Sequence, residues 1–70
     1  MAYTRGNCRL RLLLQKAGMK QAELARRTGY SRHQVSNWVN DREKMSFDAA
    51  ATVAFTLDCH MEELYEFHEG

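Results

Sequence analysis

The sequence predicts an all-α fold, a compact bundle of five short helices that forms one domain over residues 1–70. Apolar residues recur at helical spacing, no segment alternates with a period of two residues, and the chain contains no proline. A chain of 70 residues can enclose one small hydrophobic core, so a second domain does not fit. Residues 1–4 are expected to form a flexible N-terminal arm and residues 68–70 a tail.

Two helices are predicted in the first half of the chain, over residues 5–17 and 21–28. The first helix carries apolar residues at positions i, i+3, i+4 and i+7, namely Leu10, Leu13, Leu14 and Ala17. Gly18 and Gly29 are expected to end these helices, because glycine adopts the left-handed conformation of a helix C-terminus without strain. Lys20 precedes the second helix and has no side-chain oxygen, so we expect a weak cap there.

The third helix, residues 31–40, has the clearest start signal in the chain. Ser31 and Gln34 have the spacing of a capping box, which satisfies free amide groups in the first turn of a helix. Tyr30 and Val35 have the spacing of a hydrophobic staple. Residues 21–40 therefore predict two short helices joined by a tight turn.

Two further helices are predicted in the second half of the chain. Ser46 can cap a fourth helix. Its apolar face would comprise Phe47, Ala50, Ala51, Ala54 and Leu57. A fifth helix over residues 61–67 would place Met61, Leu64 and Tyr65 at positions i, i+3 and i+4, with His60 as a weak cap.

Charge is divided unevenly along the chain although the net charge is only +1. Residues 1–44 contain all ten Lys and Arg and three acids, which gives this part a net charge of +7. Residues 45–70 contain six acids and no Lys or Arg, which gives a net charge of −6. A one-sided positive surface is what long-range attraction to phosphate requires, and here it coincides with residues 21–40.

The third helix has one apolar and one polar side. At 100° per residue, Val35, Trp38 and Val39 share one arc, which predicts that they anchor the helix in the core. The opposite side and the exposed first turn carry the polar residues Arg32, His33, Ser36, Asn37 and Asn40. Arg pairs with guanine, Asn with adenine and Ser with either in the major groove, chiefly from the N-terminal part of a recognition helix. We therefore predict base contacts by Arg32, His33, Ser36 and Asn37.

Residues 21–40 resemble the helix-turn-helix of the Cro and lambda-repressor-like (XRE) family, with the pattern Q-x-x-L-A-x-x-x-G-x-S-x-x-x-[IV]-S-x-W. The matching residues are Gln21, Leu24, Ala25, Gly29, Ser31, Val35, Ser36 and Trp38. The stretch 52–67 resembles the closing helices of the family, so the similarity covers about residues 10 to 67.

The resemblance implies a lambda-repressor-like DNA-binding domain with its helix-turn-helix at helices two and three. It implies a phage or bacterial transcriptional regulator of the Cro or repressor type that binds a double-stranded DNA operator with residues 31–40 in the major groove. By the same resemblance, DNA phosphates would be contacted by Gln21, Arg26, Asn40, Arg42 and Lys44. It also implies a weak or DNA-dependent homodimer formed through the last helices and the loop before helix four.

Several residues depart from the family pattern. Many members pair an Arg and a Glu at the positions of Leu14 and Val39, and we expect these two apolar side chains to contact each other instead. Asp41 and Asp58 replace glycines of the family. Aspartate tolerates the left-handed conformation better than most residues, so the turns are expected to survive.

No catalytic, metal or cofactor site is predicted. The candidate side chains Cys8, Cys59, His33, His60 and His68 lack the spacing of metal ligands, and so small a helical core leaves little room for a substrate cleft. Both cysteines are expected to be reduced thiols. No apolar run is long enough to span a membrane, and no signal peptide is recognisable, so we expect a cytoplasmic protein that associates with the nucleoid when bound to DNA.

A protein-binding module on the same fold is the alternative function, for example an antirepressor or an inhibitor of another regulator. The acidic C-terminal half and the aromatic Tyr65 and Phe67 would then face a protein partner. Binding to duplex DNA that weakens steeply with salt favours the DNA-binding interpretation, and failure to bind any duplex at any salt favours the alternative.

Overall fold

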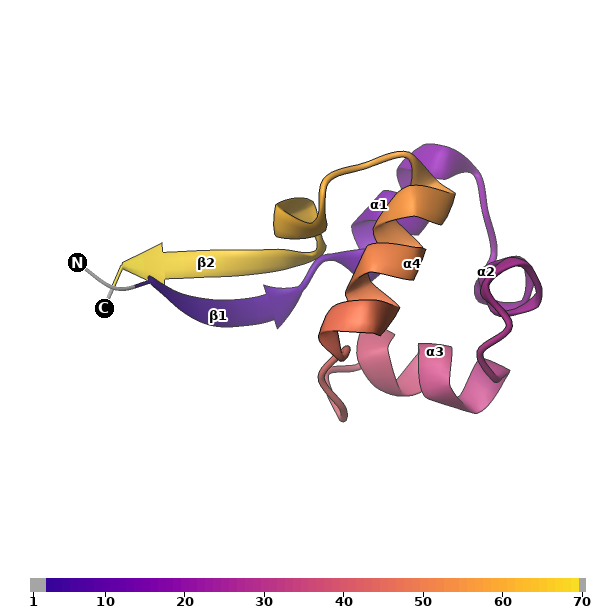
Figure 1. Ribbon diagram of the computed structural model, residues 1–70, viewed down its shortest axis with the longest axis horizontal. Helices are drawn as coiled ribbons and strands as arrows, with labels where there is room; N and C mark the ends of the chain where they lie inside the picture. Colours follow the sequence, from indigo (N-terminus) through magenta and orange to yellow (C-terminus); the bar gives the residue numbers. More distant parts are fainter. Residues whose placement is uncertain (1–2, 70) are drawn as a thin grey trace.

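The computed structural model describes residues 3–69 and consists of a small helical body with a projecting two-stranded ribbon (Figure 1). The elements in chain order are β1 (Tyr3–Cys8), α1 (Leu10–Ala17), α2 (Gln21–Thr28), α3 (Arg32–Val39), α4 (Phe47–Leu57), the 3-10 helix η1 (Met61–Leu64) and β2 (Tyr65–Glu69). The helices α1 to α4 surround the core, and β1 and β2 lie side by side and extend away from them (Figure 1).

The predicted all-α bundle of five helices is wrong at both ends of the chain. The described residues form four α-helices, one 3-10 helix and a two-stranded antiparallel sheet. The first helix begins at Leu10 rather than Arg5, and the segment predicted as a fifth helix over 61–67 is η1 followed by β2. Of the predicted arm 1–4, Tyr3 and Thr4 lie in β1, and of the predicted tail 68–70, His68 and Glu69 lie in β2. Met1, Ala2 and Gly70 lie outside the described residues.

The pairing of the two chain ends explains this difference. Tyr3 pairs with Glu69, Arg5 with Phe67 and Cys8 with Tyr65, with an irregularity in register between Arg5 and Cys8. These partners are about 60 residues apart in sequence, so neither strand carries a strong signal of its own. Gly6 weakens a helix locally and also permits close approach, because a Cβ there would lie 2.6 Å from His68 Nε2.

One buried apolar cluster holds the helical body together. Its members are Leu10, Leu13, Leu14, Leu24, Ala25, Val35, Trp38, Val39, Ala49, Val53, Ala54, Leu64 and Tyr65. Trp38 is 1% exposed, and the ring of Tyr30 packs edge-on against it at a centroid distance of 5.1 Å. Leu14 and Val39 both belong to this cluster, where α1 packs against α3, as their expected contact requires.

Helix α4 buries part of the face that the sequence predicts: Ala54 is buried, and Ala50 and Leu57 pack partly buried against the core. Ala49, Val53 and Ala54 are buried, whereas Phe47 is exposed. The predicted face included Phe47 because its spacing to Ala50, Ala51 and Ala54 is helical. The buried side of α4 is therefore shifted around the helix, towards Ala49 and Val53 and away from Phe47.

The turns and caps follow the local signals in the sequence. Ser31 and Ser46 cap α3 and α4 by accepting hydrogen bonds from the amides of Gln34 and Ala49, each at 3.0 Å. Lys20 makes no side-chain cap, as expected. The amide of His60 donates to Glu63 Oε2 at 2.7 Å, so Glu63 reinforces this turn from inside η1.

Four residues adopt the left-handed conformation in these turns, namely Gly18, Gly29, Asp41 and Asp58, with φ of 67°, 83°, 58° and 55°. The two aspartates therefore take over the backbone geometry expected of glycine, as the sequence predicts.

Candidate nucleic-acid interface

The outward side of α3 is a row of polar side chains held on a rigid base. Val35, Trp38 and Val39 anchor the helix in the core, which confirms their predicted role. On the other side, Arg32 and His33 are exposed in the first turn, and Ser36 and Asn37 are half-buried in the second. The four predicted base-contacting residues thus lie within six positions on one short helix.

Hydrogen bonds within the protein orient Asn40, at the C-terminal end of α3. Asn40 Nδ2 donates to the Ser36 carbonyl at 2.9 Å and to Ser36 Oγ at 3.3 Å. Arg11 Nη2, from α1, donates to Asn40 Oδ1 at 3.1 Å. The Asn40 amide is therefore occupied on both sides, and the guanidinium of Arg11 is the cationic group that adjoins the end of α3.

Asn37 also has a partner within the protein. Its Nδ2 donates to Glu43 Oε1 at 3.4 Å, near the long end of the range for a hydrogen bond. Its backbone carbonyl accepts from the amides of Arg42 at 2.8 Å and Glu43 at 3.3 Å. Asn37 thus ties the helix to the loop that follows, and its side-chain amide is held loosely enough to be exchanged for another acceptor.

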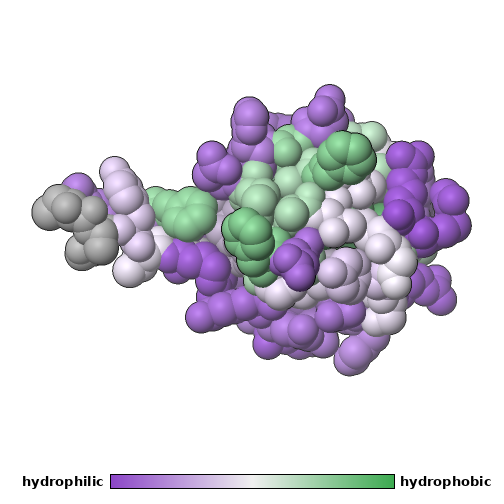
Figure 2. Space-filling view, in the orientation of Figure 1, coloured by the Kyte–Doolittle hydropathy of each residue, from purple (hydrophilic) through white to green (hydrophobic). Residues whose placement is uncertain are grey.

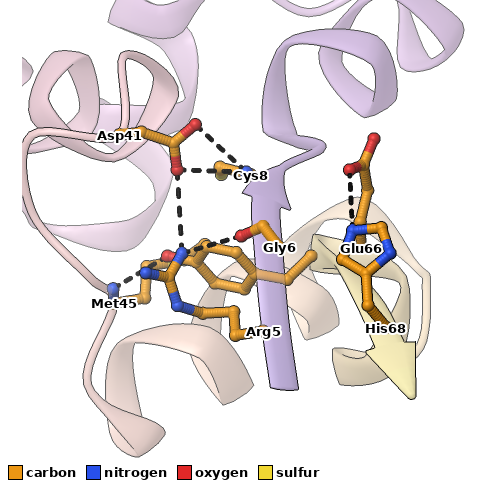
Figure 3. Close-up of polar contacts among 8 residues, drawn as sticks. Arg5, Gly6, Cys8, Asp41, Met45, Glu66 and His68 are labelled. Atoms are coloured by element: carbon orange, nitrogen blue, oxygen red, sulfur yellow. Dashed lines mark hydrogen bonds and ion pairs between the residues drawn. The ribbon is translucent and has the colours of Figure 1, made fainter. Parts of the chain in front are cut away.

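The loop 40–46 contains Asn40 and two further predicted phosphate contacts, Arg42 and Lys44. Arg42 and Lys44 are exposed, and the backbone just before them turns through Asp41 at positive φ. Contacts with the ribbon hold both ends of this loop (Figure 3). At one end Asp41 accepts from the amide of Cys8, and at the other Met45 donates to the hydroxyl of Tyr65.

A second group of predicted residues lies at the start of α2. Gln21 is half-buried and lines a surface hollow of about 230 Å³. Arg11, Leu14, Gln15, Met19 and Lys20 line the same hollow. The N-terminus of a helix carries unpaired amides and partial positive charge, so this hollow has the features of a phosphate site.

Sequence reasoning missed Arg11 and Lys20 as members of this group. Arg11 lies on a helix that carries no family motif, and Lys20 was considered only as a cap. Lys20 directly precedes Gln21, whereas Arg11 reaches the same hollow only through the tertiary arrangement of α1, which no local spacing reveals. The excess of basic residues in the first 44 positions was the signal available, and it identifies no individual residue.

The two arginines in the last turn of α2 differ in their surroundings. Arg27 forms an ion pair with Glu23 at 2.6 Å, one turn earlier. Arg26 is exposed and forms no salt bridge within residues 3–69. Of the two, Arg26 is therefore the one whose charge is available to an external anion.

Other kinds of site find little support in the part of the chain that the structure describes. Over residues 3–69, no three His, Cys, Asp or Glu side chains lie close enough together to hold a metal ion. No helix in this range is both long enough and apolar enough to cross a membrane. Both cysteines are free thiols, and burial raises the pKa of each above its ordinary value.

Comparison with known proteins identifies similar chains. The family model of the Cro/C1-type HTH DNA-binding domain matches residues 9–70. The uncharacterized HTH-type transcriptional regulator YopS, derived from the SPbeta prophage of Bacillus subtilis strain 168, is 35% identical over 63 residues, which cover 89% of this chain and 85% of that protein.

Two solved structures share the fold. A proposed DNA-binding protein from Bacteroides fragilis has a TM-score of 0.79 at 22% identity, covering 93% of this chain and all of the other. The transcriptional regulator VanUg has a TM-score of 0.73 at 20% identity, covering all of this chain and 92% of the other. At these identities the likeness concerns the fold alone.

Proposed function

The chain belongs to the Cro/C1-type helix-turn-helix DNA-binding domains, and we propose that it regulates transcription by placing α3 in the major groove of a specific duplex operator. The observation that carries this proposal is the polar side of α3, whose four candidate readers project from a helix anchored by three buried side chains. A helix fixed in this way can present Arg, His, Ser and Asn to base edges in a defined register.

The cationic and polar groups around α3 are assigned to the DNA backbone in this proposal. Gln21 would donate to a phosphate at the start of α2, with Arg11 and Lys20 beside it in the same hollow. Arg42 and Lys44 would contact phosphates beyond the end of α3. Arg26 has an unpaired charge that fits the same role. Asn40 is internally bonded to Ser36 and Arg11, so its contribution would come chiefly from orienting them.

Selection of bound duplexes from a random library tests this proposal. We expect enrichment of a short motif, together with affinity that falls steeply as salt increases, because phosphate contacts release counterions. Failure to bind any duplex at low salt would contradict the proposal and favour the protein-binding alternative. Binding without enrichment of any motif would contradict base reading by α3 while leaving a DNA-binding role.

We also propose that two copies associate when bound to adjacent half-sites, which lie about 34 Å apart on one face of the duplex. The support for this proposal is an exposed apolar surface on α4. Phe47 and Phe55 are 78% and 89% exposed, and Ala51 lies between them at helical spacing. Figure 2 shows apolar residues gathered over this helix. Two aromatic side chains per copy form a small contact, which suits association that depends on DNA.

Sedimentation velocity with and without an operator duplex tests this pairing. We expect a monomer in the absence of DNA at micromolar concentration and two copies per palindromic duplex. Phe55→Ser should weaken the second binding step, whereas Leu12→Ser, which changes an exposed apolar residue of α1, should leave it intact. Independent binding to the two half-sites by the unchanged protein would contradict the proposal.

In this proposal the protein acts in the cytoplasm of a bacterial cell, associates with the nucleoid when bound, and has no catalytic activity. The acidic residues 45–70 would face away from the duplex and be open to a protein partner. This orientation follows from charge, because phosphate attracts the basic part of the chain and repels the acidic part.

A further inference from the structure

The loop that follows α3 is held at both ends by the ribbon formed by β1 and β2 (Figure 3). At its start, Asp41 contacts β1, and at its end, Met45 contacts β2. The exposed cations Arg42 and Lys44 lie between these two contacts. A loop fixed at both ends loses little conformational freedom when a ligand binds to its middle.

The Asp41 carboxylate makes the first contact. Its Oδ1 and Oδ2 accept from the amide of Cys8 at 3.1 and 3.3 Å. Arg5 Nη1 lies 3.7 Å from Oδ1, and the Arg5 guanidinium lies over the ring of Tyr65 at 4.8 Å from its centroid. One acidic side chain is thereby joined to a strand that lies 33 positions earlier in the sequence.

The hydroxyl of Tyr65 makes the second contact. It accepts a hydrogen bond from the amide of Met45 at 3.0 Å, and the Tyr65 side chain is 8% exposed. Burial raises the pKa of Tyr65, so the hydroxyl stays neutral at physiological pH. Because Tyr65 belongs to the core, this contact joins the end of the loop to the part of the ribbon that packs against the helical body.

We propose that Asp41 and Tyr65 are positioning residues, through which the ribbon holds Arg42 and Lys44 in the geometry that contacts DNA phosphates. This inference rests on the proposed function, because it is there that Arg42 and Lys44 are assigned to DNA phosphates. It also explains an otherwise unfavourable residue. An acid beside phosphate-binding cations repels DNA, and aspartate adopts positive φ less readily than glycine, so the contacts with β1 must offset both costs.

Asp41→Gly separates the contacts from the backbone geometry, because glycine retains the left-handed conformation and removes only the carboxylate. Asp58→Gly is a matched control: Asp58 has nearly the same φ, is exposed, and lies in the turn after α4. Both variants remove one negative charge. Charge alone predicts unchanged or tighter DNA binding, so weaker binding in Asp41→Gly reports the loss of positioning.

The expected result for Asp41→Gly is an affinity for duplex DNA roughly three- to tenfold lower and a salt slope flatter by about one unit, the size of one lost phosphate contact. Asp58→Gly should retain the affinity and the slope of the unchanged protein. Asp41→Asn keeps an oxygen that can accept from Cys8, so it should restore most of the affinity. A purely structural role would change the melting temperature without changing the salt slope of the folded protein.

Tyr65→Phe tests the second contact of the loop, because it removes only the hydroxyl that accepts from Met45. Tyr3→Phe on β1 is its control. Amide hydrogen exchange in the DNA-free protein should become faster at Met45 in Tyr65→Phe and at residues 41–43 in Asp41→Gly. This readout does not require DNA binding, so it stands even if the proposed function fails. Unchanged exchange in both variants, or equal DNA affinities for Asp41→Gly and Asp58→Gly, would overturn the inference.

Discussion

Among single residues, Asn37 shows most clearly how the structure refines a predicted DNA contact. Its side-chain amide donates to Glu43 at 3.4 Å, a long hydrogen bond between exposed or half-buried groups. Reading an adenine requires both the donor and the acceptor of this amide. If Asn37 reads an adenine as proposed, its amide must release Glu43, so Glu43 would compete with the base for this side chain.

We expect Asn37→Ala to weaken operator binding by about 1–3 kcal/mol and to relax the preference at one base pair. Arg32→Ala should act in the same way at a neighbouring base pair. Titration of each variant against the operator, its single-base variants and a random duplex measures both effects. If Asn37→Ala weakened binding to operator and random duplexes equally, its role as a base reader would be refuted.

The two thiols give the protein a pH dependence that is independent of DNA. Burial raises the pKa of Cys8 and Cys59, so the unfolded chain loses these protons at a lower pH than the folded chain does. The contribution of the thiols to folding stability should be fully present below the ordinary thiol pKa and should be lost as pH rises through the higher pKa values of the folded state. Urea unfolding at pH 7, 9 and 10 measures this loss, and Cys8→Ala should reduce it.

At the level of helices, α1 packs against α3 through the apolar cluster, at the positions where the family resemblance implies a charged pair. Leu14 and Val39 are 4% and 6% exposed and lie in the same cluster. Their direct contact remains a prediction. A matched apolar pair avoids the desolvation cost of a buried ion pair, whereas one charge alone in this place would have no partner.

Exchange of this pair for charges tests the prediction. Leu14→Arg alone should cost about 3–5 kcal/mol of folding stability, because it buries an unpaired cation. Adding Val39→Glu should recover a measurable part of the loss if the two side chains meet. Leu12→Arg, at an exposed position of α1, should cost little. Thermal unfolding of the single and double variants measures these losses of stability. Additive losses would show that residues 14 and 39 do not interact.

Across the whole molecule, charge divides the chain into a basic N-terminal part, residues 1–44, and an acidic C-terminal part, residues 45–70. The basic residues lie in β1, the first three helices, the connections before α1 and α2, and the loop after α3, while residues 45–70 are acidic. The ribbon links the two parts, because β1 belongs to the basic segment and β2 to the acidic one.

This division predicts how single cations affect binding. Lys44→Ala should weaken binding to all duplexes alike and flatten the plot of log affinity against log salt by about one unit. Lys16→Ala removes the same charge from α1 and should flatten the slope less, since Lys16 belongs to neither proposed phosphate site. Fluorescence titrations at several salt concentrations give both slopes, and indistinguishable slopes would contradict the assignment of Lys44.

The sequence alone determined the parts of the fold that depend on near neighbours. The bounds of α2 and α3, the serine caps, the left-handed glycines and aspartates, and the anchors of α3 all follow from spacing within about eight residues. Such signals are physically local, because a helix forms its hydrogen bonds and most of its caps within one or two turns. The motif and its family could be recognised for the same reason.

Only the tertiary structure decided what depends on distant partners. Residues 3–8 and 65–69 become strands because they pair with each other across the length of the chain. Phe47 faces outward because the buried side of α4 is shifted towards Ala49 and Val53. Arg11 lines the same hollow as Gln21, and Asp41 accepts a hydrogen bond from Cys8, although neither arrangement is visible in a short window of sequence. β1 and β2 form their hydrogen bonds with each other, and closing so long a loop depends on the packing of the helices between them. No short segment of the sequence therefore predicts this pairing.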